Sequence, residues 1–135
     1  MHVGAAAQLS SVLDLVYEAP FRDGAWRPAL TAIADFVHAE WKAATDYLFD
    51  ADEDLYFRDS RFFDMRDAKG RKLFWSRGNG WVMGGLVRML ELLPADHASR
   101  PRFVQQFREM ADKMVTLQQP DGFWRGNGFR IVVSG

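Results

Sequence analysis

Apolar residues that recur at three- and four-residue intervals over residues 28–48 restrict the fold of this chain more than any other feature. That interval is the one that places side chains on a single face of an α-helix. Pro28 suits the first turn of such a helix, because its backbone angle is already helical and its missing N–H is not needed there. The positions that share the predicted face are Leu30, Ile33, Ala34, Val37, Trp41, Ala44 and Leu48.

Three more helices are predicted, and together they define the fold class. Residues 5–17 form a short helix, a second runs from about Gly80 or Trp81 to Leu93, and a third runs from a Ser99 cap to about Leu117. The stretch from Trp81 to Leu93 is apolar on nearly all sides, which predicts burial on most of them. The pattern therefore indicates an all-α fold of antiparallel helical hairpins.

The connection over residues 49–76 has turn formers and aromatic pairs but no sustained period. Two short strands are predicted in it, at residues 55–58 and 71–74, with a turn at residues 68–70 between them.

Within the following helix, Gly84-Gly85 is expected to let a neighbouring helix approach closely, because it lacks side chains.

Composition narrows the functional classes. The 135 residues fit one domain, and 48% of them are hydrophobic. A net charge of −1 gives no reason to expect nucleic acid or an anionic membrane as a partner. No apolar run is long enough to span a bilayer, and no signal peptide is recognised, so the expected location is the cytoplasm. The absence of cysteine excludes disulfides and thiolate metal sites.

The segment Arg77-Gly78-Asn79-Gly80-Trp81 is the strongest candidate for a site. Glycines on both sides of an asparagine predict a sharp bend, and Asn79 is a good helix N-cap. Arg77 and the free N–H groups of a helix start attract an anion, while Trp81 or Trp75 offers a flat face. This combination suits a carboxylate-bearing sugar ring such as a uronic acid. The alternative is an ordinary loop-to-helix turn, with a solvated arginine and tryptophans in the core.

Three other features of the sequence are weaker indications of function. The acidic run at residues 50–54 lacks the spacing and the closing glutamate of an EF-hand, so it predicts a solvated loop. The histidines have no other ligand types near them at metal-site spacing, so neither a metal nor a cofactor is expected. Residues 125–129, Arg-Gly-Asn-Gly-Phe, weakly repeat residues 77–81, which suits a repeated hairpin.

Several blocks, in order, resemble the glycoside hydrolase family 88/105 group, the unsaturated glucuronyl and unsaturated rhamnogalacturonyl hydrolases. These blocks are residues 43–50 (AATDYLFD), 55–63 (LYFRDSRFF), 74–81 (FWSRGNGW) and 117–125 (LQQPDGFWR). The resemblance covers roughly residues 35–125, and residues 74–81 are its most specific part.

The resemblance implies an (α/α)6 barrel of six helical hairpins around a pocket. It also implies hydration of the 4,5-double bond in a terminal unsaturated uronic acid, without a metal. An aspartate protonates the vinyl ether and activates water, and the resulting hemiketal collapses to release the following sugar. In that family the arginine and tryptophan of the RGNGW block face the substrate, which points to Arg77 and Trp81. The position of Arg58 is expected to line the same pocket.

Two departures from the family pattern define the expected organisation. The chain is expected to form one partial barrel domain. Residues 1–27 are a diverged leader, residues 28–125 are the family-like part, and residues 126–135 are a diverged tail. The family's catalytic aspartate lies in a block like DALFMAP, whose nearest equivalent here is residues 14–20, DLVYEAP. Asp14 is therefore the candidate acid, and an ordinary surface aspartate on a diverged leader is the alternative.

Three functions remain open from the sequence. The first is hydrolysis of unsaturated uronyl oligosaccharides, with an acidic oligosaccharide as the partner and Arg58, Trp75, Arg77, Asn79 and Trp81 as binding residues. The second is a non-catalytic carbohydrate-binding or assembly module, which would self-associate through exposed helix faces. The third is a helical-repeat interaction protein in which these residues only pack.

Overall fold

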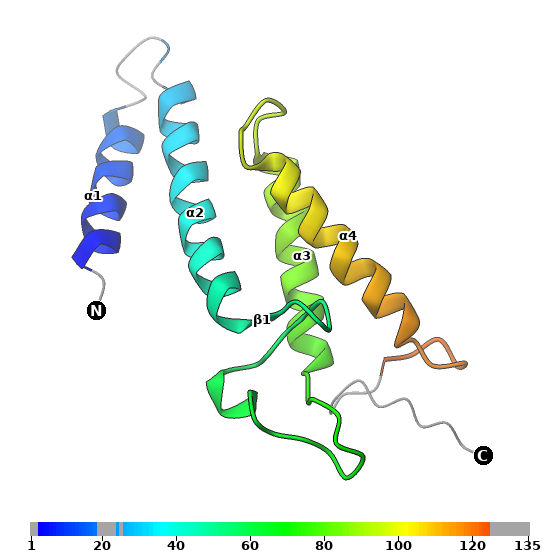
Figure 1. Ribbon diagram of the computed structural model, residues 1–135. Coiled ribbons are helices and arrows are strands. Elements are labelled where there is room, and N and C mark those ends of the chain that lie inside the picture. The colour runs from blue at the N-terminus through cyan, green and yellow to red at the C-terminus, as the bar shows by residue number, and fades with distance from the viewer. Residues whose placement is uncertain (1–2, 19–23, 25, 125–135) are drawn as a thin grey trace.

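Four helices carry most of the residues that the computed structural model describes, which are 3–18, 24 and 26–124 (Figure 1). They are α1 (Val3–Glu18), α2 (Trp26–Leu48), α3 (Ser76–Leu92) and α4 (Arg100–Thr116). Helix α1 packs against α2, and α3 packs against α4, so the helices form two antiparallel hairpins. The all-α class and the hairpin arrangement predicted from the sequence are confirmed.

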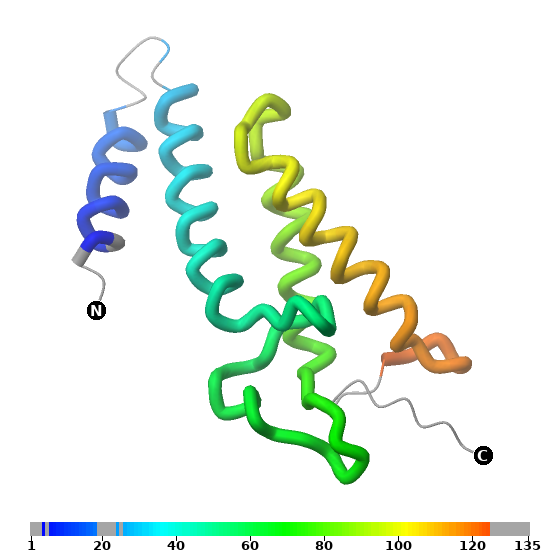
Figure 2. Tube along the Cα trace, in the orientation of Figure 1, coloured from blue at the N-terminus to red at the C-terminus, as the bar shows by residue number. Residues whose placement is uncertain are grey.

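A small β-hairpin follows α2 at once. Strand β1 (Phe49–Asp50) pairs antiparallel with β2 (Leu55–Tyr56), with Phe49 opposite Tyr56. A single turn of 3-10 helix, η2 (Ser60–Phe62), comes next. Figure 2 shows that the rest of this connection gathers at one end of the helices, near the segment that leaves α4.

The predicted pairing of residues 55–58 with 71–74 is wrong. Residues 71–74 contribute only an isolated bridge, between Arg66 and Lys72, although the predicted turn is present with Gly70 at φ 77°. The Asp67 carboxylate accepts hydrogen bonds from the backbone N–H groups of Lys69 and Arg71. These donors hold the local turn and are not available to a strand ladder.

Helix α3 begins at Ser76, four to five residues earlier than the sequence predicts, and Trp75 occupies its N-cap position. Gly78 and Gly80 are not among the glycines with positive φ, so the predicted bend at residues 78–80 is a helical turn instead. The backbone N–H of Asn79 donates to the Trp75 carbonyl at 3.1 Å, within the first turn. Asn79 therefore lies inside the helix and is not its cap.

The prediction that α3 is buried on most sides is also wrong. Trp81 and Leu92 are each 80% exposed, and a Cβ built at Gly84 or Gly85 meets no atom within 4 Å. The glycine pair therefore faces open space in the described part of the chain, and no neighbouring helix approaches it there. One face of α3 is left uncovered.

Two apolar clusters hold the fold. The larger one joins α2, α3 and α4, and its centre is formed by Phe103 and Met110, both 0% exposed, with Leu86 beside them. Trp41 of α2 packs on Phe103, with ring centroids 4.6 Å apart. The smaller cluster lies beneath the long connection and contains Leu55, Phe57, Phe74 and Leu117. It fixes the connection against the end of α4.

The loop between α3 and α4 is tied down by a histidine. Ser99 occupies the N-cap position of α4, as predicted, but it makes no side-chain cap hydrogen bond. Its hydroxyl pairs instead with Nδ1 of His97 at 2.7 Å, and Nε2 of His97 lies 3.2 Å from the Asp35 carboxylate. His97 thus links this loop to α2.

The weak repeat at residues 125–129 lies outside the described residues.

Candidate functional site

An alternation of aromatic and cationic side chains lies where the long connection enters α3. The guanidinium of Arg77 lies 5.0 Å from the centroid of the Trp75 ring, and that of Arg58 lies 5.8 Å from the same ring. Arg58 also lies 5.9 Å from the Phe62 ring. These four residues, Arg58, Phe62, Trp75 and Arg77, are called the Trp75 cluster below. The distances are those of cation–π contacts, which orient a guanidinium without neutralising its charge.

The carboxylate next in sequence to Arg58, that of Asp59, is hydrogen-bonded to another arginine. Asp59 accepts from Nε and Nη2 of Arg61, both at 2.9 Å, and also from the Arg61 backbone N–H. The hydrogen bond from the Arg61 side chain lowers the pKa of Asp59 below its usual range. Arg58 reaches Asp59 only at 3.6 Å, with its side chain 56% exposed. Its charge therefore remains available to a ligand.

Arg77 is exposed and makes none of the ion pairs found among the described residues. It lies in the first turn of α3, and the Trp75 N-cap contributes no side-chain hydrogen bond. The positive end of the helix dipole therefore adds to the charge of the guanidinium. Trp81 follows Arg77 by four residues, which places the two on the same helix face.

Asn79 and Gly78 lie within the same turn but do not face solvent as Arg77 does. Asn79 is 1% exposed, and its amide is bonded to the backbone of Tyr56 and Trp75. Both N–H donors of its amide are used and the side chain is buried, so its geometry does not suit the predicted substrate contact. A Cβ at Gly78 would lie 2.7 Å from Cε3 of Trp75. Only a glycine lets the indole lie directly on the helix at this point.

Asp14 is not brought to the Trp75 cluster. It is exposed, in the last part of α1, and α1 ends beside the start of α2 (Figure 1). The cluster lies beyond the other end of α2, a helix of 23 residues, which corresponds to about 35 Å. In this arrangement an aspartate at position 14 cannot deliver a proton to a ligand held by Arg77.

The acidic run at residues 50–54 is less solvated than its composition predicts. Asp50 pairs with Lys72 at 2.6 Å, with its side chain only 10% exposed, and Glu53 pairs with Lys113 at 2.5 Å. These pairs attach the β-hairpin to the long connection and to α4. No group of three potential metal ligands occurs among the residues the structure describes.

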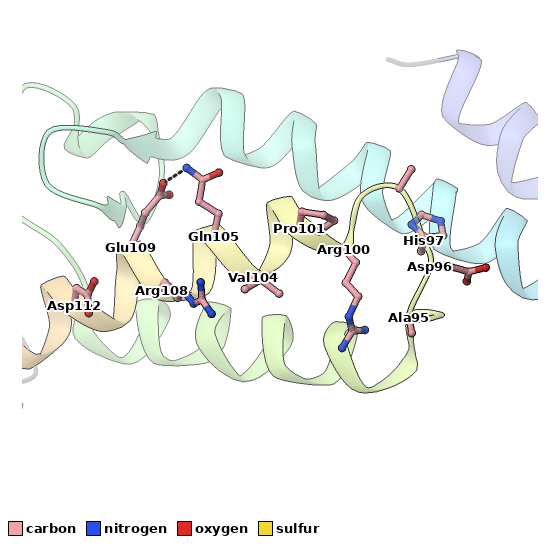
Figure 3. A pocket seen from close by; sticks show the side chains of 11 residues that line it. Ala95, Asp96, His97, Arg100, Pro101, Val104, Gln105, Arg108, Glu109 and Asp112 are labelled. Atoms are coloured by element: carbon pink, nitrogen blue, oxygen red, sulfur yellow. Dashed lines mark hydrogen bonds between the residues drawn. The ribbon is translucent and has the colours of Figure 1, made fainter.

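An open groove of about 670 Å³ lies along α4 and the loop before it (Figure 3). Its polar side chains are largely engaged within the protein. Arg100 donates to the carbonyls of Leu90 and Leu93, and Glu109 accepts from Gln105 at 2.7 Å. Asp96 pairs with Arg27. The groove has no set of unpaired charges that converge on one point, so the Trp75 cluster is the better candidate site.

The structure adds three residues that the sequence alone did not single out, and it gives Gly78, already part of the motif, a different role from the predicted bend. Phe62, Gly78, Tyr56 and Arg61 each set the position or charge of a predicted binding residue. Gly78 is the one that a sequence signal could have revealed, because a glycine three residues after a tryptophan leaves room for the indole on a helix.

Among the described residues, no helix is both long and apolar enough to cross a membrane.

Comparisons with known proteins agree on one family. The model described as Glycosyl Hydrolase Family 88 matches residues 29–127. An unsaturated 3S-rhamnoglycuronyl hydrolase from Alteromonas sp. (strain LOR) is 40% identical over 90 residues, covering 67% of this chain and 22% of that protein. A protein of the same description from Formosa agariphila is 38% identical over 97 residues, covering 67% of this chain and 26% of that protein.

Solved structures share the fold. A protein described as a polysaccharide lyase superposes with a TM-score of 0.69 at 28% identity, covering 76% of this chain and 32% of its own. A glycosyl hydrolase family 88 protein from Bacteroides vulgatus gives a TM-score of 0.65 at 28% identity, covering 72% and 31%. The chain thus spans about a quarter of the length of its curated relatives and about a third of these structures.

Proposed function

This chain belongs to glycosyl hydrolase family 88, and we propose that it carries the substrate-binding end of a hydrolase for unsaturated uronyl oligosaccharides. The ligand is an oligosaccharide that ends in a 4,5-unsaturated uronic acid. The names of the two curated relatives, both unsaturated rhamnoglycuronyl hydrolases, support this substrate class.

The observation that carries the proposal is the pair of guanidinium groups held around one indole. Arg58 and Arg77 both lie within 6 Å of the Trp75 ring centroid, and the only carboxylate paired with either among the described residues is Asp59, 3.6 Å from Arg58 and hydrogen-bonded to Arg61. A uronate carboxylate is planar and accepts two parallel hydrogen bonds from a guanidinium. Trp81, exposed on the same face of α3 as Arg77, offers an apolar surface to the sugar ring.

The proposed reaction is hydration of the 4,5-double bond. A carboxylic acid donates a proton to the vinyl ether, water adds to the other carbon, and the hemiketal opens and expels the next sugar. Asp59, the acid nearest Arg58 in sequence, is a poor proton donor because its pKa is lowered by Arg61. Asp14 lies at the far end of α2. We therefore assign substrate binding to this part of the protein and leave the proton donor outside the Trp75 cluster.

A second candidate is a non-catalytic binding or assembly module of the same fold. The uncovered face of α3 favours it, because Trp81, Val87 and Leu92 are exposed large hydrophobic residues. In a complete (α/α)6 barrel, which we propose for the parent fold, further hairpins would cover such faces. For this chain alone, the exposed faces predict self-association.

The test is binding and turnover of a 4,5-unsaturated uronyl disaccharide by the purified chain. Calorimetry measures affinity, and loss of the double bond's ultraviolet absorbance measures turnover. Arg77→Ala is expected to weaken binding about tenfold or more, since it removes a charged hydrogen-bond partner worth roughly 1.5–3 kcal/mol. Arg108→Ala, an exposed arginine of α4, is the matched control and should leave affinity unchanged.

Asp14→Asn tests whether Asp14 is the proton donor. If Asp14 supplied the proton, this change would abolish turnover and leave binding intact. We expect no change in either measurement, because Asp14 is remote from the Trp75 cluster. An Arg77→Ala variant that bound the disaccharide as well as the unchanged chain would overturn the proposed function. Light scattering on the same samples reports the assembly state.

A further inference from the structure

We propose that Asn79 is a positioning residue, which sets the separation of Arg58 and Arg77 and makes no contact with the ligand itself. The part of this inference that concerns sugar binding rests on the proposed function. The part that concerns the two arginines rests on contacts within the protein and is tested without any sugar.

The amide of Asn79 makes three hydrogen bonds to the backbone. Its Oδ1 accepts from the Tyr56 N–H at 2.8 Å, and its Nδ2 donates to the Tyr56 carbonyl at 3.0 Å and to the Trp75 carbonyl at 3.1 Å. A primary amide has two N–H donors, and both are bonded here. The side chain is 1% exposed, so a ligand cannot reach it.

The two residues bonded to this amide each precede one of the two arginines closely in sequence. Tyr56 lies two positions before Arg58, and Trp75 lies two positions before Arg77. Between them runs a long connection, whose described secondary structure after β2 is the single turn η2 and one isolated bridge. The rings of Phe57 and Phe74, with centroids 4.7 Å apart, pack the two ends together, but apolar packing is not directional and few ladder bonds fix their register. Asn79 joins those ends directly.

Tyr56 is in turn fixed to the other hairpin. Its hydroxyl pairs with Oγ1 of Thr45 in α2 at 2.6 Å, and its ring packs on Phe49 with centroids 5.0 Å apart. A hydrogen-bonded path therefore runs from α3 through Asn79 and Tyr56 to α2. Replacing Asn79 would remove the hydrogen bonds between the strand that leads to Arg58 and the helix that presents Arg77.

Gly78 completes the arrangement on the side of Trp75. The indole lies so close to the helix that a Cβ would meet Cε3 at 2.7 Å. With the indole held there, both guanidinium groups lie against one ring, Arg77 at 5.0 Å and Arg58 at 5.8 Å. The middle residues of the motif thus have separate tasks. Gly78 seats the indole, and Asn79 sets the register of the two arms.

The absence of cysteine makes the separation directly measurable. Nitroxide labels at Arg58→Cys and Arg77→Cys report the distance between the two positions by dipolar broadening of the electron spin resonance spectrum. The same pair is then measured with Asn79→Ser added. A control pair at Gln105→Cys and Asp112→Cys spans two turns of α4, about 10 Å, and reports whether the helices remain folded.

We expect Asn79→Ser to weaken the broadening of the 58/77 pair while the α4 pair stays unchanged. An unchanged 58/77 spectrum would overturn the positioning role. Loss of broadening at both pairs would also overturn it, because that result reports unfolding rather than a local change of register. Asn79→Asp, which keeps the acceptor for the Tyr56 N–H, should give an intermediate result.

Affinity for the unsaturated uronyl disaccharide is measured in parallel. In the unchanged chain, Arg58→Ala and Arg77→Ala should be non-additive, because the two groups act on one ligand. In the Asn79→Ser background their effects should become additive, and affinity should already be about tenfold weaker. If the unchanged chain bound no disaccharide while the 58/77 pair still depended on Asn79, the proposed function would fail and the positioning role would stand.

Discussion

The side chain of Asn79 exchanges two hydrogen bonds with the backbone of Tyr56, accepting from its N–H at 2.8 Å and donating to its carbonyl at 3.0 Å. Residues facing each other in an antiparallel sheet exchange the same pair of bonds. Asn79 therefore continues the β1–β2 hairpin with a side chain and joins it to α3. This relationship explains both the early start of α3 and the burial of a polar side chain in its first turn.

Replacing Asn79 with leucine should destabilise the protein by about 2–4 kcal/mol, because two buried backbone groups of Tyr56 lose their partner. Chemical denaturation in urea measures the change. Gln105→Ala is the matched control, since Gln105 is an exposed amide on α4 and its loss should cost within about 0.5 kcal/mol. Equal stabilities for the two variants would contradict the structural role of Asn79.

Gly80→Ala should stabilise the protein, whereas Gly78→Ala should disturb its structure, although the two positions are two residues apart in one helix. At Gly78 the new Cβ would lie 2.7 Å from the Trp75 indole, whereas at Gly80 it meets nothing within 4 Å. Gly80→Ala should stabilise the protein by roughly 0.5–1 kcal/mol through helix propensity. Gly78→Ala should displace the indole, shift tryptophan fluorescence and weaken disaccharide binding. Identical behaviour of the two variants would contradict the seating of Trp75 on Gly78.

Arg61→Ala should weaken disaccharide binding although Arg61 is not proposed to touch the sugar. Its removal frees the Asp59 carboxylate, which lies 3.6 Å from Nε of Arg58 and would then compete with the ligand for that guanidinium. A loss of about threefold is expected, in the range of an exposed ion pair. Adding Asp59→Asn should restore affinity by removing the competing charge. Failure of this restoration would show that Arg61 acts by another route.

The turn at residues 67–71 should contribute to stability in a pH-dependent way. Hydrogen bonds from the backbone and side chain of Arg71 lower the pKa of Asp67 from 3.8 to about 2. A lowered folded-state pKa means that the ionised form stabilises the fold above about pH 4. This contribution is lost as the pH falls through the interval between 3.8 and 2.

Asp67→Asn isolates that contribution, because asparagine keeps an oxygen acceptor for the backbone N–H groups but carries no charge. The difference in unfolding free energy between the unchanged chain and this variant should be largest above pH 4 and should shrink towards pH 2. Urea denaturation at several pH values measures it. A difference that is independent of pH would rule out a role for the Asp67 charge.

The helices were predictable because their signal is local. Apolar spacing placed the long helix at 28–48, against Trp26–Leu48 in the structure, and the last helix at about 99–117, against Arg100–Thr116. Where the neighbours of a residue lie three or four positions away, a single sequence contains most of the information. The predicted start of α3 was wrong because the Asn79 side chain bonds to the backbone of Tyr56, 23 positions away, and does not cap the helix.

The candidate site was predictable only in part. Arg77 and Trp75 follow from the motif, and Arg58 from a resemblance to relatives, and the structure brings these three together. It does not bring Asp14 there, because α2 separates them. The contribution of Phe62 depends on how the long connection folds back, which no local pattern encodes.

The sequence by itself determined the helices, the family and the chemical character of the site. Periodicity sets a helix face, and an ordered series of blocks sets a family, without any knowledge of distant contacts. Tertiary structure alone decided which polar residues of the motif are exposed to solvent and which are buried. Arg77 and Asn79 are both polar and two residues apart, yet one is exposed and the other is 1% exposed. The reason is that a helix turns about 100° per residue, so adjacent positions face different surroundings, and only packing against β2 determined which face was buried.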